Sequence, residues 1–180
     1  MTSWFQRKNA APLLPILLAS GAVAIALLAA HRCAAAETDV ERGRYLVTIA
    51  GCNHCHTPGY LLGKPDENQF LGGSDVGFFL PHLGIFVGPN LTGDKETGLG
   101  NWSQDDIVKA LQTGITPDGR ELAPIMPWHD FAELKRSDAD AIAAYLKTIP
   151  IVKHQVAGPF GPDEKPKIAV FKVLAPSDPN

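Results

Sequence analysis

The pentapeptide Cys52-Asn53-His54-Cys55-His56 constrains this chain more than any other feature. It places two thiols three positions apart and a histidine directly after the second thiol, which is the attachment sequence of a c-type haem. Each thiol can form a thioether with one vinyl group of the porphyrin, and His56 then becomes the fifth ligand of the iron. The chain has no second C-x-x-C-H. We therefore expect one haem c, attached through Cys52 and Cys55, around which the fold must close.

The N-terminal 36 residues have the order of a secretory signal peptide. A basic pair is followed by the uncharged run 10–30 and then by three alanines that end at Ala36, where we expect cleavage. The run is also long enough to span a bilayer, so a retained N-terminal anchor is the alternative. In both cases the basic pair stays in the cytoplasm and the rest is exported. We expect a periplasmic domain, either soluble or tied to the inner membrane.

The charge that remains after cleavage restricts the partners. Removal of Arg7, Lys8 and Arg32 leaves 13 of the 16 basic residues against 19 acidic ones, a net charge of −6. This balance argues against nucleic acid as a partner and favours docking on a basic patch of another protein. Cys33 also falls in the expected signal peptide, so only the motif cysteines remain and no disulfide framework is possible.

Three helices are predicted from capping signals and apolar periodicity. The first begins after Thr38, with Glu41 in the position of a capping box. The second follows Ser103 and carries two aspartates in its first turn, where the helix dipole favours negative charge. The third is expected to begin at Ser137 and to end before Pro150.

Residues 57–101 are rich in Gly and Pro and follow no sustained period. Irregular segments of this length are usually functional, and enclosing a flat cofactor is one such function. We expect an all-α domain over residues 37–156, with three main helices and long loops wrapped around the haem. A Pro- and Gly-rich tail, residues 157–180, follows it, with 167–174 as a short extended piece on the surface. Apolar contacts with the porphyrin or with other faces of the domain are expected from Phe70, Phe78, Phe79, Leu80, Leu83, Ile85 and Phe86.

Met126 is the candidate sixth ligand. The other methionine, Met1, is lost with the signal peptide, and prolines on both sides of Met126 restrict the backbone of its loop. The simpler interpretation is a methionine that fills a gap in the core. The alternative ligands are three histidines: His82, His129 and His154. His129 is the first of these alternatives, because it lies only three residues from Met126.

These residues resemble the class I c-type cytochromes. The likeness is greatest to the single-haem units of cytochrome subunits of bacterial membrane-bound alcohol and aldehyde dehydrogenases, and it spans about residues 39–150. Besides the haem motif, the segments that carry it are 42–46 (RGRYL), 88–92 (GPNLT), 94–100 (DKETGLG), 102–103 (WS), 117–120 (PDGR), 126–128 (MPW) and 143–146 (AAYL). One haem unit instead of two or three, and a tail of its own, distinguish this chain from those subunits.

The resemblance implies a class I cytochrome c fold in which the first and last helices cross, with Gly43 against the region of Tyr145. It also implies that the carbonyl of Pro89 accepts a hydrogen bond from the second ring nitrogen of His56, which orients the ligand. Contacts to the haem propionates are implied for Trp102 and Arg120. A core aromatic and a surface charge are the simpler interpretations of these two residues.

We therefore expect a mono-haem electron carrier that is not an enzyme by itself, either alone or as a subunit of a dehydrogenase complex. Its partners would be redox proteins: a dehydrogenase or other respiratory donor, and an oxidase or copper protein as acceptor. The alternative is a haem enzyme, or a sensor of gas or peroxide, in which Met126 does not bind the iron or is displaced. A redox dithiol or zinc site at Cys52 and Cys55 lacks the βαβ context or the second ligand pair that it would need.

Overall fold

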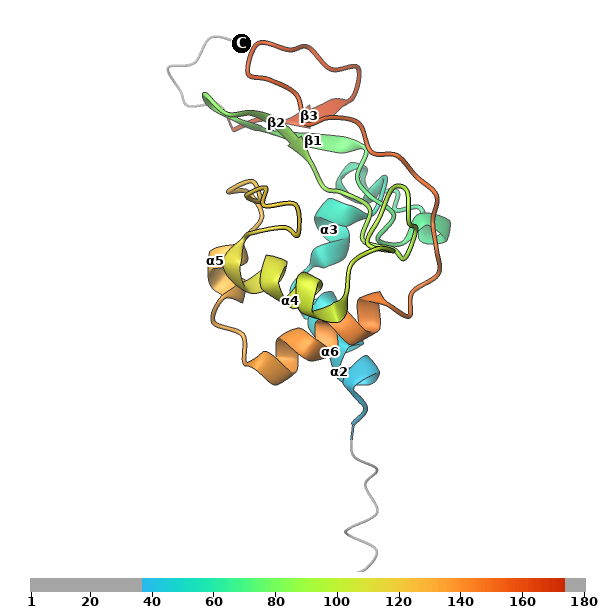
Figure 1. Cartoon of the computed structure of the whole chain (residues 1–180). Helices are drawn as coiled ribbons and strands as arrows, with labels where there is room; N and C mark the ends of the chain where they lie inside the picture. The colour runs from blue at the N-terminus through green and yellow to red at the C-terminus, as the bar shows by residue number, and fades with distance from the viewer. Residues whose placement is uncertain (1–36, 174–180) are drawn as a thin grey trace, which may run out of the picture. The chain divides into compact units, whose positions relative to one another are not determined.

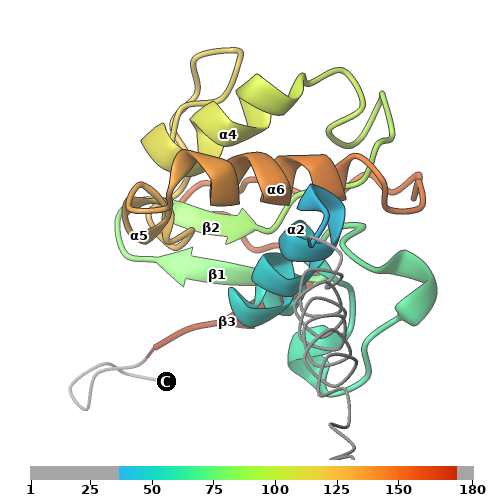
Figure 2. The same ribbon diagram turned by 90° about the horizontal axis from the view of Figure 1, so that it is seen from below.

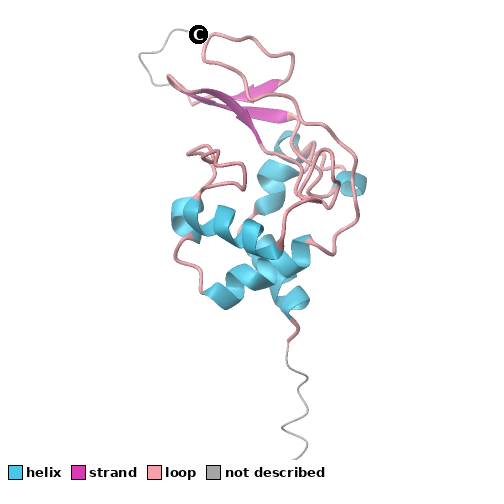
Figure 3. Ribbon diagram, in the orientation of Figure 1, coloured by secondary structure: helices cyan, strands magenta, loops and turns pink. Residues whose placement is uncertain are grey.

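The structure, a computed structural model, describes residues 37–173, and its helices and strands lie in the unit Thr38–Asn180. The expected signal peptide or anchor, with its cleavage site after Ala36, lies outside the described residues. Within the unit the helices gather at one end and a small sheet lies at the other (Figures 1 and 3). No helix within residues 37–173 is long and apolar enough to cross a membrane.

The first and last long helices, α2 (Asp39–Ile49) and α6 (Arg136–Leu146), cross at close range (Figure 2). A Cβ atom at Gly43 would lie 1.9 Å from the carbonyl oxygen of Ala141 and 2.7 Å from Cβ of Tyr145, so only glycine allows this approach. The contact expected between Gly43 and the Tyr145 region is confirmed. The predicted capping box of α2 is also present: the Thr38 hydroxyl accepts from the backbone N–H of Glu41, and the Glu41 carboxylate accepts from the N–H of Thr38.

Helix α4 (Gln104–Thr113) begins where the sequence predicted, after Ser103, and Asp106 completes a second capping box. The prediction for the third long helix was wrong in detail. It begins at Arg136 with Lys135 as N-cap, so Ser137 lies inside its first turn, and it ends at Leu146, before Pro150. Three shorter helical pieces were not predicted individually: α3 (Cys52–His56), η1 (Tyr60–Leu62) and η2 (Glu67–Gln69). A short helix, α5 (Trp128–Phe131), connects α4 to α6.

The core is formed where these helices meet. The buried apolar side chains of one continuous cluster come from α2, α4 and α6, with contributions from the loops. Among them are Leu46, Val47, Ile107, Val108, Ile142 and Leu146. This packing fixes the three long helices relative to one another and leaves the motif helix α3 at their edge.

The expectation of an all-α fold was wrong. Strands β1 (Val76–Leu80), β2 (Gly84–Val87) and β3 (Ala169–Phe171) form a three-stranded sheet in the order β2-β1-β3. β1 pairs antiparallel with β2 and parallel with β3, and Phe78 lies opposite both Phe86 and Phe171. The domain is therefore a mixed structure in which a sheet accompanies the helices.

The apolar runs 78–80 and 85–87 form this hairpin around a turn at residues 81–83. Sequence reasoning assigned their side chains to an irregular loop, because runs of three to five residues carry too little periodicity to separate a strand from a loop. The third strand comes from the tail: residues 169–171, within the piece expected to be extended over 167–174, form β3, and residue 174 lies outside the described residues.

Candidate cofactor site

The two motif cysteines lie on one face of α3, because residues three positions apart are neighbours on a helix. Both side chains are half-buried, and both line the same cavity. Burial raises the pKa of the Cys52 thiol to about 11 and raises the pKa of Cys55 as well. Reactive dithiols have the opposite property, a lowered pKa that favours the thiolate. The site is thus unlike that of a thiol oxidoreductase.

His56 is buried, and its ring is held in one orientation. Nδ1 donates a hydrogen bond to the carbonyl oxygen of Pro89 at 2.7 Å, so the bond implied by the family resemblance is confirmed. Burial lowers the pKa of His56, an effect that the bond to Pro89 opposes in part. A neutral ring with Nδ1 engaged leaves the lone pair of Nε2 for a metal.

Gly88 explains how the Pro89 carbonyl reaches this ring. A Cβ atom at Gly88 would lie 1.7 Å from the carbonyl oxygen of Cys55 and 3.3 Å from Nδ1 of His56. Any side chain at this position would push the loop away from α3. The motif helix and the loop at residues 88–89 therefore form one rigid wall.

This wall is one side of a cavity of about 780 Å³, within the range of about 300–1,000 Å³ that is usual for small-molecule and cofactor sites. The other sides come from the β1–β2 hairpin, α4, α6 and the loop 120–127, which we call the Met loop. All seven predicted site residues line the cavity: Cys52, Cys55, His56, Pro89, Trp102, Arg120 and Met126. Much of the remaining surface is apolar and includes Phe78, Phe86, Leu99, Ile107, Leu111 and Ile142. Of the seven apolar residues expected to contact porphyrin or protein, Phe78 and Phe86 therefore reach the cavity.

Met126 is half-buried, and local hydrogen bonds hold its backbone in the Met loop. Its N–H donates to the carbonyl of Ala123 at 2.9 Å, and its own carbonyl accepts from the N–H of Trp128 at 2.8 Å. Proline residues 124 and 127 restrict the same segment. The thioether is thus presented to the cavity from a constrained loop.

The three alternative histidine ligands lie elsewhere. His82 is exposed in the hairpin turn, His129 stacks on Trp128 with ring centroids 3.6 Å apart, and His154 forms a 2.8 Å hydrogen bond from Nδ1 to the carbonyl of Gly72. None of them lines the cavity. Among the residues that the structure describes, Met126 is the candidate sixth ligand that does.

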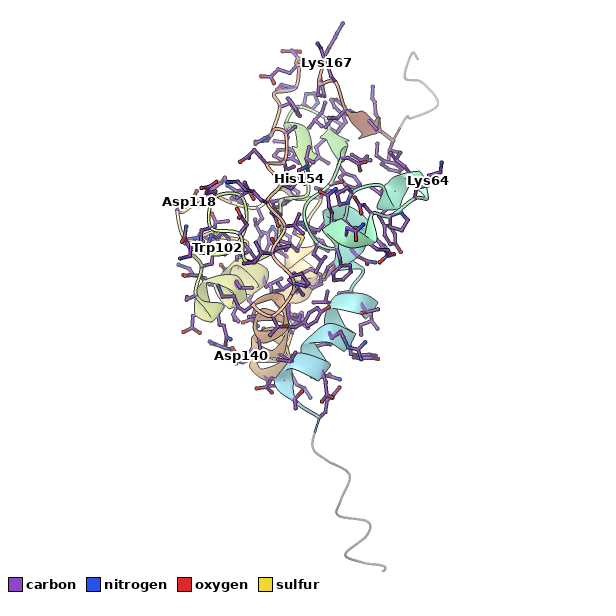
Figure 4. The ribbon with its side chains drawn as sticks, turned by 90° about the vertical axis from the view of Figure 1, so that its right-hand side faces the viewer. Lys64, Trp102, Asp118, Asp140, His154 and Lys167 are labelled. Atoms are coloured by element: carbon purple, nitrogen blue, oxygen red, sulfur yellow. The ribbon has the colours of Figure 1, made fainter. Side chains whose placement is uncertain are left out.

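Trp102 and Arg120 approach the cavity in different ways. Trp102, just before α4 (Figure 4), lines the cavity and also packs against the hydrophobic core, and Lys147 Nζ donates to its carbonyl oxygen at 2.6 Å. The core interpretation of this aromatic residue agrees with this packing, and its contact with a propionate stays a prediction. Arg120 is exposed at the rim, where its carbonyl oxygen accepts hydrogen bonds from Thr116.

Sequence reasoning missed a buried polar cluster in the wall of the cavity, to which Asn90 and Thr97 belong. Asn90, which is 1% exposed, donates from Nδ2 to Oγ1 of Thr97 at 3.0 Å and to the carbonyl of Val152 at 2.7 Å. Its Oδ1 accepts from the N–H of Thr92 at 2.8 Å. The sequence placed Asn90 and Thr92 in a recognised segment but gave no sign of their distant partner. The cavity-lining residues 155–159 were also missed, because they lie in the segment assigned to the end of the domain and the tail.

The donor set fits a covalently bound haem. Two thiols and a ring nitrogen stand on one wall, a thioether stands on another, and apolar side chains occupy much of the space between them. Within residues 37–173, no group of three or more His, Cys, Asp or Glu residues is arranged to hold a metal ion directly.

Residues 40–150 match the Cytochrome c family. The chain belongs to this family. The cytochrome therefore carries covalently bound haem c, and its Cys52–Cys55 pair fits the attachment motif. Electron transport is the function of the family, as the sequence analysis expected.

Similar proteins support the resemblance to cytochrome subunits of dehydrogenases. The cytochrome is 36% identical over 115 residues to the fructose dehydrogenase cytochrome subunit of Gluconobacter japonicus, covering 62% of this chain and 22% of that protein. It is 35% identical over 128 residues to the cytochrome c subunit of the quinone alcohol dehydrogenase of Gluconobacter oxydans (strain 621H), covering 71% and 25%. The gluconate 2-dehydrogenase cytochrome c subunit of Pantoea cypripedii is 35% identical over 107 residues, covering 59% and 22%. The chain thus spans about a quarter of the length of these relatives, and its resemblance to dehydrogenase cytochrome subunits is confirmed.

Proposed function

We propose that this cytochrome is a periplasmic mono-haem carrier that moves single electrons from a dehydrogenase or other respiratory donor to a downstream acceptor. In this proposal Cys52 and Cys55 hold the haem, and His56 and Met126 are its axial ligands. When bound, the haem supplies a one-electron couple of iron. The residues of the chain supply binding, orientation and an environment that excludes water.

The observation that carries this proposal is the arrangement of ligands around the cavity. His56 is buried and oriented by Pro89, while Met126 is the thioether that lines the same space. A histidine–methionine pair closes both axial positions and raises the reduction potential, which suits electron transfer rather than binding of gas or peroxide. The proposal therefore excludes catalysis by the cytochrome itself.

Two further residues of the cavity are candidates for binding the propionate groups of the haem. We assign contacts with the haem propionates to Trp102 and Arg120, both of which line the cavity. The indole N–H and the guanidinium are donors, and the guanidinium also carries the positive charge that a carboxylate favours. These contacts would hold the macrocycle at its polar edge while the thioethers hold it at another.

Export and partner class follow from the N-terminal segment and from the charge. The basic, apolar and small-residue order of residues 1–36 supports export, with removal of the leader or its retention as an anchor. The net charge of −6 beyond residue 36 supports docking on a basic surface of a redox protein. Because the relatives are named as cytochrome subunits of dehydrogenases, a dehydrogenase is the first partner to test.

The proposal is tested by replacing Met126 in the mature protein. Met126→Ala should abolish the weak near-infrared band that methionine gives on ferric haem, lower the reduction potential and open the reduced protein to carbon monoxide. His129→Ala is the matched control, because His129 is the neighbouring alternative ligand and lies outside the cavity. Spectra of both oxidation states and the mass of the holoprotein provide the measurements.

A wild-type protein that lacks the near-infrared band and binds carbon monoxide readily would contradict the proposed ligation. It would favour a haem enzyme or a sensor with an open sixth position. A wild-type protein that lacks the band yet stays closed to carbon monoxide, and that opens to carbon monoxide in His129→Ala but not in Met126→Ala, would move the ligand to His129.

A further inference from the structure

The chain that follows α6 remains on the domain well beyond the family match, which ends at residue 150. We call residues 151–173 the C-terminal strap. Figure 1 shows the strap running from the helical end of the domain to the sheet, and Figure 4 shows it passing His154 on the way to Lys167. Residues 155–159 of the strap line the cavity described above. A segment outside the family domain thus contributes to the wall of its cofactor site.

Buried polar groups anchor the start of the strap. The carbonyl of Val152 accepts from Asn90 Nδ2 at 2.7 Å, and its N–H donates to Thr92 Oγ1 at 3.1 Å. His154 continues the attachment through its 2.8 Å bond to the carbonyl of Gly72. Buried polar groups require hydrogen-bond partners. The buried Asn90 and Thr92 side chains find many of theirs in the backbone of the strap.

The sheet anchors the other end. Ile85 and Phe160 exchange two backbone hydrogen bonds, each 2.9 Å long, at the outer edge of β2. Farther along, β3 pairs with the opposite edge of β1. The strap therefore contacts both sides of the hairpin, and the cavity-lining residues 155–159 are fixed between two sets of anchors.

Two glycines of the domain allow the strap to approach closely, because they have no side chain. A Cβ atom at Gly84 would lie 2.1 Å from the carbonyl oxygen of Phe160, and one at Gly73 would lie 2.2 Å from a methyl carbon of Val156. The first clash is with backbone, so a side chain at Gly84 would force the strap away from the hairpin. The fit extends over the same stretch that crosses the cavity.

We propose that the C-terminal strap is a haem-binding wall of this cytochrome that keeps water and small ligands away from one side of the cofactor. Residues 156–159 are Val, Ala, Gly and Pro, so the wall places no charge on the cavity. Exclusion of water disfavours the oxidised, more positively charged state and raises the reduction potential. The inference rests on the haem occupying this cavity, as proposed above, but not on the identity of the sixth ligand.

The first test uses the full-length holoprotein and displaces the strap by adding a methyl group at Gly84, where it would clash with the backbone of Phe160. Gly84→Ala should lower the reduction potential and make cyanide binding to the ferric protein severalfold faster. Gly63→Ala is the control, because Gly63 also has a positive φ of 74° but a Cβ atom there meets nothing within 4 Å. Equal potentials and equal cyanide rates in the two folded variants would overturn the proposal.

The second test does not depend on the folding of Gly84→Ala. Val156→Asp places a carboxylate in the cavity wall, whereas Val170→Asp places the same charge on β3, outside the cavity. A carboxylate at the wall favours ferric iron, so Val156→Asp should raise the ferric-to-ferrous ratio roughly tenfold, a drop of about 59 mV for a one-electron couple. Val170→Asp should leave the potential near that of the wild type. The same shift in both variants would overturn the proposal.

The near-infrared band of the wild-type protein tests the ligation by Met126 separately from the shielding by the strap. Absence of the band in the wild-type protein would reject Met126 as ligand. The comparison of strap variants with their controls would still decide whether the strap shields the haem.

Discussion

Gly114, the C-cap residue of α4, connects that helix with the loop that carries the candidate sixth ligand. It adopts a φ of 70°, and a Cβ atom there would lie 2.5 Å from the indole of Trp128. Trp128 in turn donates its N–H to the carbonyl of Met126. The absence of one side chain at the end of α4 thus lets Trp128 pack closely and helps to set the position of the thioether.

We expect Gly114→Ala to displace Trp128 and, with it, the Met loop. The near-infrared band of the ferric protein should weaken, because the length and angle of an iron–sulfur bond are sensitive to small movements of the loop. Gly119→Ala is the matched control, since Gly119 also has a positive φ, 83°, but a Cβ atom there meets nothing within 4 Å. If the two variants lose the band to the same extent, backbone strain rather than contact with Trp128 is the cause.

At the scale of elements, short capping motifs in the sequence determine where two of the long helices begin. The capping box of α4 joins the Ser103 hydroxyl and backbone N–H to the Asp106 carboxylate, with oxygen and nitrogen separations of 2.7 and 2.9 Å. These bonds lower the pKa of Asp106, that from the Ser103 side chain most strongly. The part of the cap that the Asp106 carboxylate supplies therefore depends on its ionisation, whereas the bond from the Asp106 N–H to the Ser103 hydroxyl does not.

We expect Ser103→Ala to lower the free energy of unfolding by about 1 kcal/mol at neutral pH, the usual cost of losing an N-cap. Because the pKa of Asp106 is lower in the folded protein, its part of this stabilisation is present above the ordinary value of 3.8. It is lost as the pH falls through the folded value. Denaturant unfolding of wild type and variant at neutral and acidic pH measures the decrease in the difference.

Ser137→Ala is the control for this experiment. Ser137 lies in the first turn of α6, whose N-cap is Lys135, so its loss should change stability little. An equal cost for Ser103→Ala and Ser137→Ala at neutral pH would contradict the assignment of the cap.

At the scale of the whole molecule, the cavity determines what the domain needs in order to be stable. The space of about 780 Å³ between α3, α4, α6 and the hairpin is partly open to solvent, and much of its lining is apolar. Without the cofactor these apolar side chains would face water, which is unfavourable, whereas a bound porphyrin would cover them. The cofactor is an integral part of the packing.

We expect the double variant Cys52→Ala, Cys55→Ala to lose the added mass of haem and most of its fixed tertiary structure. Mass spectrometry and near-ultraviolet circular dichroism measure the two losses. Asn53→Ala is the control, because it changes a residue between the two cysteines on α3 and leaves both thiols in place; it should retain both properties. A double variant with a wild-type near-ultraviolet spectrum would show that the domain packs without covalent haem.

The sequence predicts those parts of this molecule whose signals are local. Thr38 with Glu41 and Ser103 with Asp106 predict two helix starts, and the haem motif predicts the centre of the cavity. The pairing of β3 with β1 could not be predicted, because the two strands meet only after the chain has passed around the domain. The same holds for the bond of Asn90 to Val152, 62 positions along the chain.

The strap comes last in the chain, and in the export proposed above the N-terminal part of the chain crosses the membrane first. Cys52 and Cys55 would therefore reach the periplasm before residues 155–159 and β3. During that interval nothing from the strap covers its side of the cavity, and a porphyrin has a route to the two thiols. The order of residues in the chain thus allows the cofactor to be loaded first and enclosed afterwards.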